Sequence, residues 1–181
     1  IKNMIKNKNF INYTKKFNLK NKFSIVLGGS GLLGSEVCKA LNQFGSRVLN
    51  LDLIQNKNSN ERKISFYKLD INNLESFEKK IEKIIKIYGV PEIFINCSYP
   101  KTKTWPKLSF KTADIKSLKK NIDLHLNSYI WIARVIAEKM EKFKVKGSIV
   151  QFSSMYGLVG QNMNIYEKTK IKENLAYSAI K

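Results

Sequence analysis

The sequence is poor in arginine and in acidic residues, although it is strongly basic. Asp and Glu together number 14 against 33 Lys and Arg, which gives a formal net charge of +19. Arg47, Arg62 and Arg134 are the only arginines, and lysine, asparagine and isoleucine are abundant. Specific phosphate and base recognition usually depends on the planar guanidinium group of arginine, whereas this composition is typical of A/T-rich coding sequence. We therefore expect no nucleic-acid partner and keep one only as the weakest alternative.

Cysteine and long apolar runs are scarce as well. Cys38 and Cys97 are the only cysteines and have no metal-ligand spacing around them, so we expect no metal site. No uninterrupted apolar run approaches the roughly 18–20 residues that a membrane span needs. Residues 1–22 carry seven lysines and no acid, and they lack the apolar core of a secretory signal. These features predict a reduced, cytoplasmic protein without membrane association, with a loosely ordered basic arm (1–22) before one domain (23–181).

The segment FSIVLGGSGLLG, residues 23–34, organises the rest of the chain. A short apolar run ends at Gly28, Gly31 and Gly34 follow at intervals of three, and residues 36–44 have helical periodicity. A strand, a glycine turn and a helix start place a pyrophosphate on free backbone amides. Gly28 would allow unusual turn dihedrals, Gly31 would let the phosphates approach, and Gly34 would let helix and strand pack closely. This segment predicts a nucleotide site; the alternative is a glycine-rich turn with no ligand.

An acidic residue follows at the position that a dinucleotide domain uses. Residues 47–53 predict a second strand that carries Asp52, eighteen residues beyond Gly34. A carboxylate there accepts hydrogen bonds from the adenosine ribose and repels a 2′-phosphate, so NAD is favoured over NADP. Lys57 and Arg62 in the following polar loop could weaken that repulsion, and an exposed aspartate at a strand end remains the alternative.

The remaining chain alternates strands and helices. We expect strands at 64–69, 92–96 and 147–152, a helix capped by Asn72 or Asn73, and a long helix over 114–143. This order predicts an α/β fold with a doubly wound, five-stranded parallel sheet of the Rossmann type. Asp70 and Asn96 then lie at the carboxyl ends of strands, where such sheets bind ligands.

Three further features lie in the second half of the chain. Trp105 lies among lysines in a long loop, 98–111, which suits an anionic substrate or a packed loop anchor. His125, the only histidine, falls on the apolar stripe of the long helix, and spacing alone favours a core histidine. Tyr177 and Lys181 are four residues apart on a last helix capped by Asn174, so they share a face.

Together these residues resemble the short-chain dehydrogenase/reductase family over residues 23–181. The matching features are the glycine turn, Asp52, Asp70, Asn96, the Ser153-Ser154 pair, and Tyr177-Ser178-Ala179-Ile180-Lys181. The details resemble sugar oxidoreductases of bacterial flagellin-modification and legionaminic-acid-type nonulosonate pathways. The features concerned are Tyr99-Pro100, Leu124-His125-Leu126, Ser153-Ser154-Met155-Tyr156-Gly157 and Ile165-Tyr166-Glu167.

The resemblance implies hydride transfer between NAD and a sugar hydroxyl or ketone. Tyr177 would be the general acid/base, Lys181 would favour its phenolate and bind the nicotinamide ribose, and Ser154 would donate to the substrate oxygen. The catalytic residues implied are Ser154, Tyr177, Lys181 and His125. The cofactor-binding residues implied are Gly28, Ser30, Gly31, Leu33, Gly34, Asp52, Asp70, Ile71, Asn96, Ser98, Tyr177 and Lys181.

Three departures keep alternatives open. Leu32 gives the glycine spacing common in sugar epimerases and dehydratases, and His125 stands where the family usually has a catalytic asparagine. The interval from Ser154 to Tyr177 is about ten residues longer than usual, which makes 161–172 a candidate substrate-side lid. Members of the family run to roughly 250 residues, so we expect a fragment that lacks the C-terminal part of the fold and has little activity alone. The full-length protein would be a homodimer or homotetramer; an epimerase, a dehydratase or a non-catalytic nucleotide-binding module remains the alternative.

Overall fold

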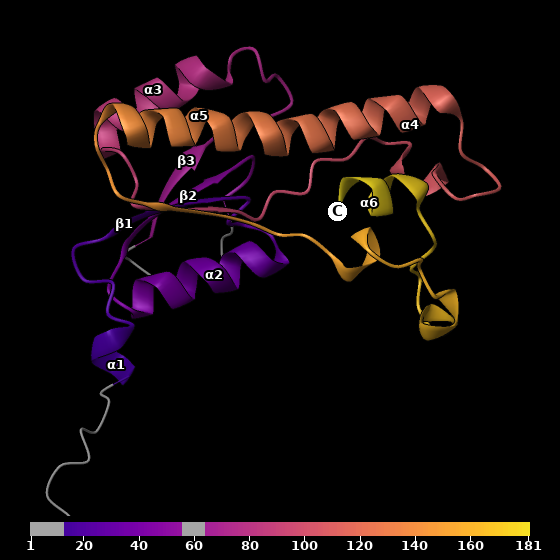
Figure 1. Ribbon diagram of the computed structural model, residues 1–181, viewed down its shortest axis with the longest axis horizontal. Coiled ribbons are helices and arrows are strands. Elements are labelled where there is room, and N and C mark those ends of the chain that lie inside the picture. The colour runs from indigo at the N-terminus through magenta and orange to yellow at the C-terminus, as the bar shows by residue number, and fades with distance from the viewer. Residues whose placement is uncertain (1–12, 56–63) are drawn as a thin grey trace, which may run out of the picture.

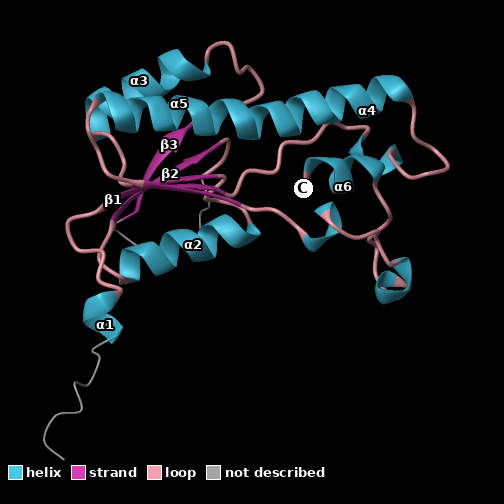
Figure 2. Cartoon of the chain, viewed as in Figure 1, coloured by secondary structure: helices cyan, strands magenta, loops and turns pink. Residues whose placement is uncertain are grey.

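The computed structural model describes residues 13–55 and 64–181 and has one five-stranded parallel sheet between helices (Figures 1 and 2). The strand order is β3-β2-β1-β4-β5, so the order reverses on either side of β1. The strands are β1 (Phe23–Leu27), β2 (Arg47–Asp52), β3 (Ile64–Lys68), β4 (Ile93–Asn96) and β5 (Ser148–Gln151). Each predicted strand is found to within one residue at either end, and the doubly wound α/β fold is confirmed.

Helices cover both faces of this sheet. The helix α2 (Leu32–Gln43) lies on one face, and α3 (Phe77–Tyr88) and α5 (Ser128–Lys142) lie on the other (Figure 1). The main core joins α3 and α5 to the sheet through fully buried side chains such as Phe77, Ile81, Ile132, Leu49 and Phe94. Burying each such side chain contributes roughly 1.5–3 kcal/mol. The strand tips are therefore held on a rigid base.

The long helix predicted over 114–143 is present, with an irregular turn in its middle. It comprises α4 (Ile115–Ile122), a π-helical turn (Asp123–Asn127) and α5. Asp114 caps it, since its carboxylate accepts a hydrogen bond of 2.8 Å from the Ser117 amide. Single π-turns occur frequently at functional sites, and His125 lies within this one.

Two predicted helix starts are wrong. The expected cap at Asn72 or Asn73 is not used, because Asn73 accepts from the Ser76 amide at 3.0 Å in a separate turn and α3 begins at Phe77. Asparagine side chains compete with helix formation in this way. The helix α2 starts at Leu32, before the periodic segment 36–44, since Gly31 is already its N-cap.

Short elements complete the carboxyl side of the sheet. They are the 3₁₀ turns Trp105–Lys107, Met155–Gly157 and Met163–Tyr166, and the last helix, α6 (Leu175–Ile180). Asn174 caps α6 as predicted, accepting from the Tyr177 amide at 3.1 Å. Among the described residues, no helix combines the length and hydrophobicity that a membrane crossing requires.

The basic arm and one polar loop are only partly covered by the described ranges. Residues 1–12 lie outside them, as do Lys57 and Arg62. Residues 13–22 include α1 (Tyr13–Lys16), and the Leu19 amide donates to the Phe44 carbonyl at 2.8 Å. The division between an arm and a domain at residue 22 stays a prediction.

Candidate functional site

The glycine turn joins β1 to α2 in a conformation that requires glycine at two positions. Gly28 has φ +76°, and a Cβ on it would lie 2.7 Å from the Ser98 backbone. A Cβ on Gly34 would lie 2.8 Å from the Gly28 carbonyl carbon and closer still to its oxygen. Gly31 is less confined, because its Cβ would meet the Gly28 oxygen at 3.3 Å. The turn geometry therefore agrees with the unusual dihedrals expected at Gly28 and with the close packing expected at Gly34. The approach of phosphates to Gly31 stays a prediction.

Asp52 ties this turn to the end of β2. One carboxylate oxygen accepts from the Ser30 amide at 2.9 Å, and the other accepts from the Leu53 amide at 2.7 Å. Asn50 adds a second tie by donating to the Ser30 hydroxyl at 3.0 Å. A carboxylate oxygen accepts more than one hydrogen bond, so Asp52 retains capacity for ribose hydroxyls.

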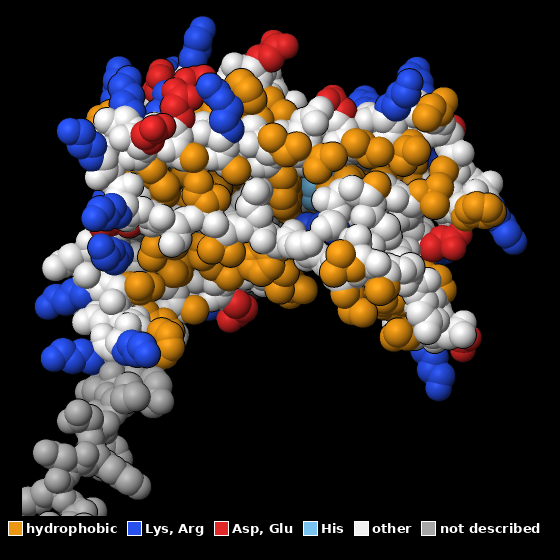
Figure 3. Space-filling model, viewed as in Figure 1, with side chains coloured by type: hydrophobic (Ala, Val, Ile, Leu, Met, Phe, Trp, Pro, Cys, Tyr) orange, Lys and Arg blue, Asp and Glu red, His pale blue; other side chains and the backbone are white. Residues whose placement is uncertain are grey.

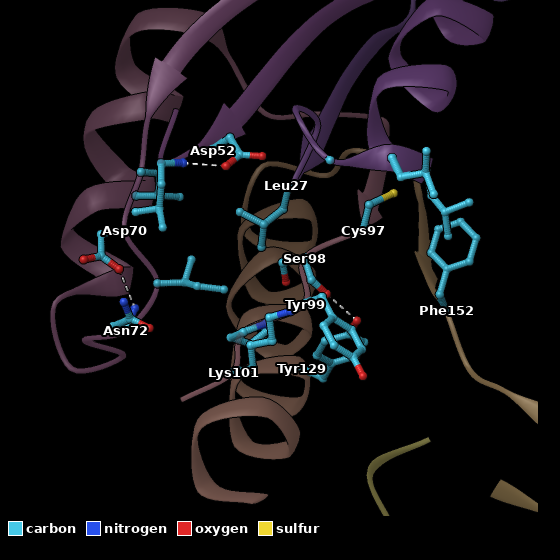
Figure 4. Close-up of a pocket in the computed structure, with 18 of the residues that line it drawn as sticks. Leu27, Asp52, Asp70, Asn72, Cys97, Ser98, Tyr99, Lys101, Tyr129 and Phe152 are labelled. Carbon is cyan, nitrogen blue, oxygen red and sulfur yellow. Dashed lines mark hydrogen bonds between the residues drawn. The ribbon is translucent and has the colours of Figure 1, made fainter. Parts of the chain in front are cut away.

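A cleft of about 550 Å³ opens above the strand tips, next to the glycine turn (Figure 4). Eight predicted cofactor residues line it: Gly28, Gly31, Leu33, Asp52, Asp70, Ile71, Ser98 and Lys181. Ser30 and Gly34 lie in the turn behind this lining. Asn96 is fully buried, and its side-chain oxygen accepts from the amide and hydroxyl of Ser98 at 3.1 and 2.6 Å. The position of the cleft follows the rule that ligands bind where the strand order reverses.

A second, aromatic pocket of about 250 Å³ adjoins the cleft. Its walls include five aromatic rings, those of Tyr99, Trp105, Tyr156, Tyr166 and Tyr177. The extra segment contributes half of the lining, through Gln161, Met163, Tyr166, Ile171 and Lys172. Tyr99 lines both cavities.

Hydrogen bonds hold the extra segment in place over this pocket. The hydroxyl groups of Tyr156 and Tyr166 lie 2.9 Å apart, and the Gln161 side chain accepts from the Asn174 amide at 2.9 Å. The segment predicted as a substrate-side lid therefore forms one wall of the aromatic pocket. In the view of Figure 1, hydrophobic side chains spread across the middle of the surface, and most lysine and arginine side chains lie at its outer edge (Figure 3).

Lys181 and Tyr177 face different cavities. The Lys181 amine donates to the Phe152 carbonyl at 3.0 Å and to the Tyr129 hydroxyl at 3.2 Å, and it lines the cleft. Tyr177 lines the aromatic pocket; the Lys181 amide donates to its carbonyl at 3.0 Å, but within the described chain no hydrogen bond joins the two side chains. Lys181 follows the end of α6, and burial lowers the pKa of its amine. The pair therefore lies at the boundary between the two cavities.

The third predicted catalytic side chain, Ser154, begins a 3₁₀ turn. Its hydroxyl accepts from the Tyr156 amide at 3.2 Å, and it lies outside the lining of either cavity. The neighbouring Ser153 donates to the Lys181 carbonyl at 2.6 Å. These contacts fix the loop after β5 against the end of α6, and the catalytic role of Ser154 stays a prediction.

His125 is fully buried in an aromatic cluster, as its place on the apolar stripe predicts. Its ring centre lies 4.8 Å from that of Tyr99, 4.9 Å from that of Tyr129 and 6.0 Å from that of Trp105. Burial, with the nearby charge of Lys181, lowers the pKa of His125 to about 4, against an opposing effect of the Pro100 carbonyl. Within the described residues neither ring nitrogen has a hydrogen-bond partner of normal geometry. The imidazole is therefore neutral at pH 7.

Sequence reasoning assigned no site role to Tyr99 or Tyr129. Tyr99 follows β4 at the ligand-binding edge, so the rule that drew attention to Asn96 also applied to it. Tyr129 lies one helical turn beyond His125 on the same face, a position that by itself indicates only a core residue. Both side chains border Lys181: its amine lies 5.5 Å from the ring centre of Tyr99 and 4.8 Å from that of Tyr129.

Comparisons with known proteins agree with this geometry. The family model described as short chain dehydrogenase matches residues 22–172. The post-translational flagellin modification protein A of Campylobacter coli is 27% identical over 172 residues, covering 90% of this chain and 67% of that protein. An acetoacetyl-CoA reductase of an Acinetobacter strain is 25% identical, covering 78% and 59%. A crystal structure of a short-chain dehydrogenase from Leptospira borgpetersenii with bound NAD⁺ superposes with a TM-score of 0.77 at 21% identity, covering 93% of this chain and 63% of that one.

Proposed function

Because the chain belongs to the short-chain dehydrogenase family, we propose that the protein is a nicotinamide-dependent oxidoreductase acting on a hydroxyl or ketone group. The observation that carries the proposal is the pair of adjoining cavities at the strand tips. Lys181 lines the cleft beside the glycine turn, Tyr177 lines the aromatic pocket, and Tyr99 lines both. A cofactor in the first cavity and a substrate in the second would meet at the Tyr177–Lys181 boundary.

The residues of the cleft suit a dinucleotide. The backbone amides at the start of α2, beside Gly31, suit a pyrophosphate, and a Cβ on Gly31 would crowd it. Asp52 would accept from ribose hydroxyls, and its negative charge favours NAD over NADP. When bound, the nicotinamide supplies the hydride donor or acceptor.

Two side chains of the chain itself would handle the substrate proton. The Tyr177 phenolate would take it from an alcohol, and the Tyr177 hydroxyl would give it to a ketone. A free tyrosine, with a pKa of about 10, is a weak base near pH 7. The positive charge of Lys181 would stabilise the negative charge that the Tyr177 oxygen carries during this proton transfer. Ser154 would donate to the substrate oxygen after moving from the Tyr156 amide.

For the substrate we propose a sugar or a sugar derivative of flagellin modification or surface-polysaccharide synthesis. The name of the Campylobacter coli relative supports this pathway. Aromatic rings can pack against the apolar face of a sugar ring while tyrosine hydroxyls bond to its hydroxyl groups, and Lys172 in the pocket suits an anionic group. We also propose that the protein is cytoplasmic, in keeping with its low cysteine content, and that the full-length protein forms a homodimer or homotetramer.

The test uses the complete protein that contains this chain, incubated with NAD or NADP and a panel of free, phosphorylated and nucleotide-linked sugars. Nicotinamide absorbance reports net redox change, and calorimetry reports dinucleotide binding. Replacing Tyr177 by Phe should lower kcat at least about 100-fold and leave dinucleotide binding intact. Tyr88→Phe, at the end of α3 and away from both cavities, is the matched control. Absence of net nicotinamide turnover with every sugar of the panel would overturn the proposal, whether or not the dinucleotide binds.

Specific features favour two other outcomes of the same test. The glycine spacing with Leu32 favours a sugar epimerase or dehydratase, which would convert a sugar with no net change in nicotinamide absorbance. His125, at the position of the family's usual asparagine, favours a non-catalytic nucleotide-binding module, which would bind the dinucleotide without converting any sugar. Product analysis by mass spectrometry and nuclear magnetic resonance separates both outcomes from the oxidoreductase.

A further inference from the structure

Tyr129 makes two hydrogen bonds that the proposed function leaves unexplained. Its hydroxyl donates to the Ser98 carbonyl at 2.6 Å, just beyond the end of β4 (Figure 4). The same hydroxyl accepts from the Lys181 amine at 3.2 Å. The side chain is buried, so these contacts form inside the protein, between α5 and the strand tips.

The direction of each hydrogen bond follows from the chemistry of the groups. A tyrosine hydroxyl has one hydrogen, and the carbonyl of Ser98 can only accept, so this hydrogen is committed to Ser98. The hydroxyl oxygen therefore presents its free lone pair to Lys181, whose ammonium can only donate. We infer that Tyr129 is a positioning residue that holds the Lys181 ammonium at the wall of the cofactor cleft. The inference rests on the proposed function for the role of Lys181 in the reaction.

The second anchor of Lys181 comes from another element. The Phe152 carbonyl, just beyond β5, accepts from the amine at 3.0 Å. Two of the three ammonium hydrogens are thus bound to rigid parts of the fold, and the third is left for a ligand in the cleft that Lys181 lines. Loss of the Tyr129 hydroxyl would leave one anchor and let the amine turn away from this position.

The surroundings make oxygen acceptors necessary for the charged lysine. Burial lowers the pKa of Lys181, because the charged ammonium is less stable in this partly buried site than in water. The titratable side chains packed around this region are Cys97, Tyr99, His125, Tyr129 and Tyr177, while Asp52, Asp70 and Lys101 line the same cleft. Burial raises the pKa of Cys97 to about 11 and that of Tyr129 to about 12, so both are neutral at pH 7.

Tyr129, and not His125, is the residue of the long helix that binds the Lys181 amine. His125 occupies the position where the resemblance places a polar catalytic asparagine, yet its nitrogens make no hydrogen bond of normal geometry within the described chain. The hydroxyl that the long helix offers to Lys181 comes from Tyr129, one helical turn further on.

The first experiment measures the pKa of Lys181 in the complete protein, without any need for activity. Lysines labelled with ¹³C at Cε are titrated by nuclear magnetic resonance, and the Lys181→Met variant assigns the signal. In Tyr129→Phe the pKa of Lys181 should fall by about one pH unit, because an acceptor of the charged form is lost. Tyr67→Phe, a tyrosine on β3 whose ring packs against Tyr88, should leave the Lys181 pKa unchanged. An unchanged pKa in Tyr129→Phe would overturn the inference.

A reciprocal measurement needs no change at Tyr129 and covers the case in which Tyr129→Phe fails to fold. With tyrosines labelled at Cζ, the Tyr129 signal should move in Lys181→Met and stay in place in Lys170→Met, a change at an exposed lysine. A Tyr129 signal that ignores Lys181→Met would refute the contact.

The complete protein supplies the kinetic readout. In Tyr129→Phe the alkaline limb of kcat/KM should move to lower pH by the same unit, and kcat should fall about tenfold. A lower kcat with an unmoved alkaline limb would indicate a purely structural role and overturn the inference. If the unaltered protein binds a dinucleotide without turnover while the Lys181 pKa still falls in Tyr129→Phe, the proposed function fails and the positioning of Lys181 stands.

Discussion

Replacing Gly34 by alanine is the sharpest test of how the glycine turn is built. A Cβ at this position would lie 2.8 Å from both the Gly28 carbonyl carbon and the Gly29 Cα, and closer still to the Gly28 oxygen. All three are backbone atoms, so no side-chain rotation relieves the contact. The turn and the first residues of α2 would have to move apart.

The size of the effect follows from two opposing contributions. Overpacking of a closely packed site costs typically about 1–3 kcal/mol, and immovable backbone atoms place this case near 3 kcal/mol. Gly34 lies within α2, where alanine is favoured over glycine by about 1 kcal/mol. The net loss in the free energy of unfolding is therefore about 2 kcal/mol, which lowers the unfolding temperature by roughly 4–8 °C in a chain of this size.

Two other glycines separate packing from ligand binding in the same assay. Gly160→Ala should leave the unfolding temperature unchanged, because nothing lies within 4 Å of a Cβ there. Gly31→Ala should change stability by less than about 1 kcal/mol but weaken dinucleotide binding at least about tenfold, since its methyl group would stand where the phosphates approach. Thermal unfolding followed by circular dichroism and dinucleotide titration by calorimetry provide the two readouts. A Gly34→Ala chain that unfolds at the wild-type temperature would refute the packing argument.

Three further predictions concern charge. In Asp52→Asn, the dissociation constant for NAD should rise about tenfold and the preference for NAD over NADP should shrink, as measured by calorimetry. For His125, whose pKa falls from 6.5 to about 4 on folding, the unfolded state binds the extra proton between these values. Wild-type stability should therefore be complete above pH 6.5 and fall by up to roughly 3 kcal/mol toward pH 4, a loss that urea unfolding should find reduced in His125→Asn. Lys139 is buried and donates to Glu78 and Glu82 at 3.0 and 3.1 Å, which raises its pKa. Lys139→Met should lower the unfolding temperature, and this difference should vanish as the pH rises above 10.5 through the raised pKa.

The strands were predictable because each is short, apolar and interrupted by residues that end it. Gly28 ends the first run, and Gly89 and Pro91 separate the third helix from β4. Burial on both faces of a parallel sheet leaves nearly continuous apolar sequence, which applies to the inner strands β1, β2 and β4, whereas the edge strands β3 and β5 are more exposed. The alternation of strands and helices then determined the topology.

The helix limits and the site contacts were harder to predict, for a physical reason. At Asn73 a local side-chain turn competes with a helix cap, and the two have the same sequence signal. The contacts of Lys181 depend on residues 29 and 52 positions earlier in the chain, Phe152 and Tyr129. The spacing of Tyr177 and Lys181 predicts a shared face on one helix, but it says nothing of the acceptors that other elements bring to the lysine.

The two cavities are lined by different parts of the chain, and this difference predicts how substitutions affect substrate and cofactor binding. The cleft is built from the strand tips and the glycine turn, whereas half of the aromatic pocket lining comes from residues 161–172. Tyr99 lines both cavities, and residues 161–172 are held by hydrogen bonds to Tyr156 and Asn174. Substitutions within 161–172 should therefore change which substrate binds without changing dinucleotide affinity. Substitutions at Tyr99 should affect both, because its side chain lines both cavities.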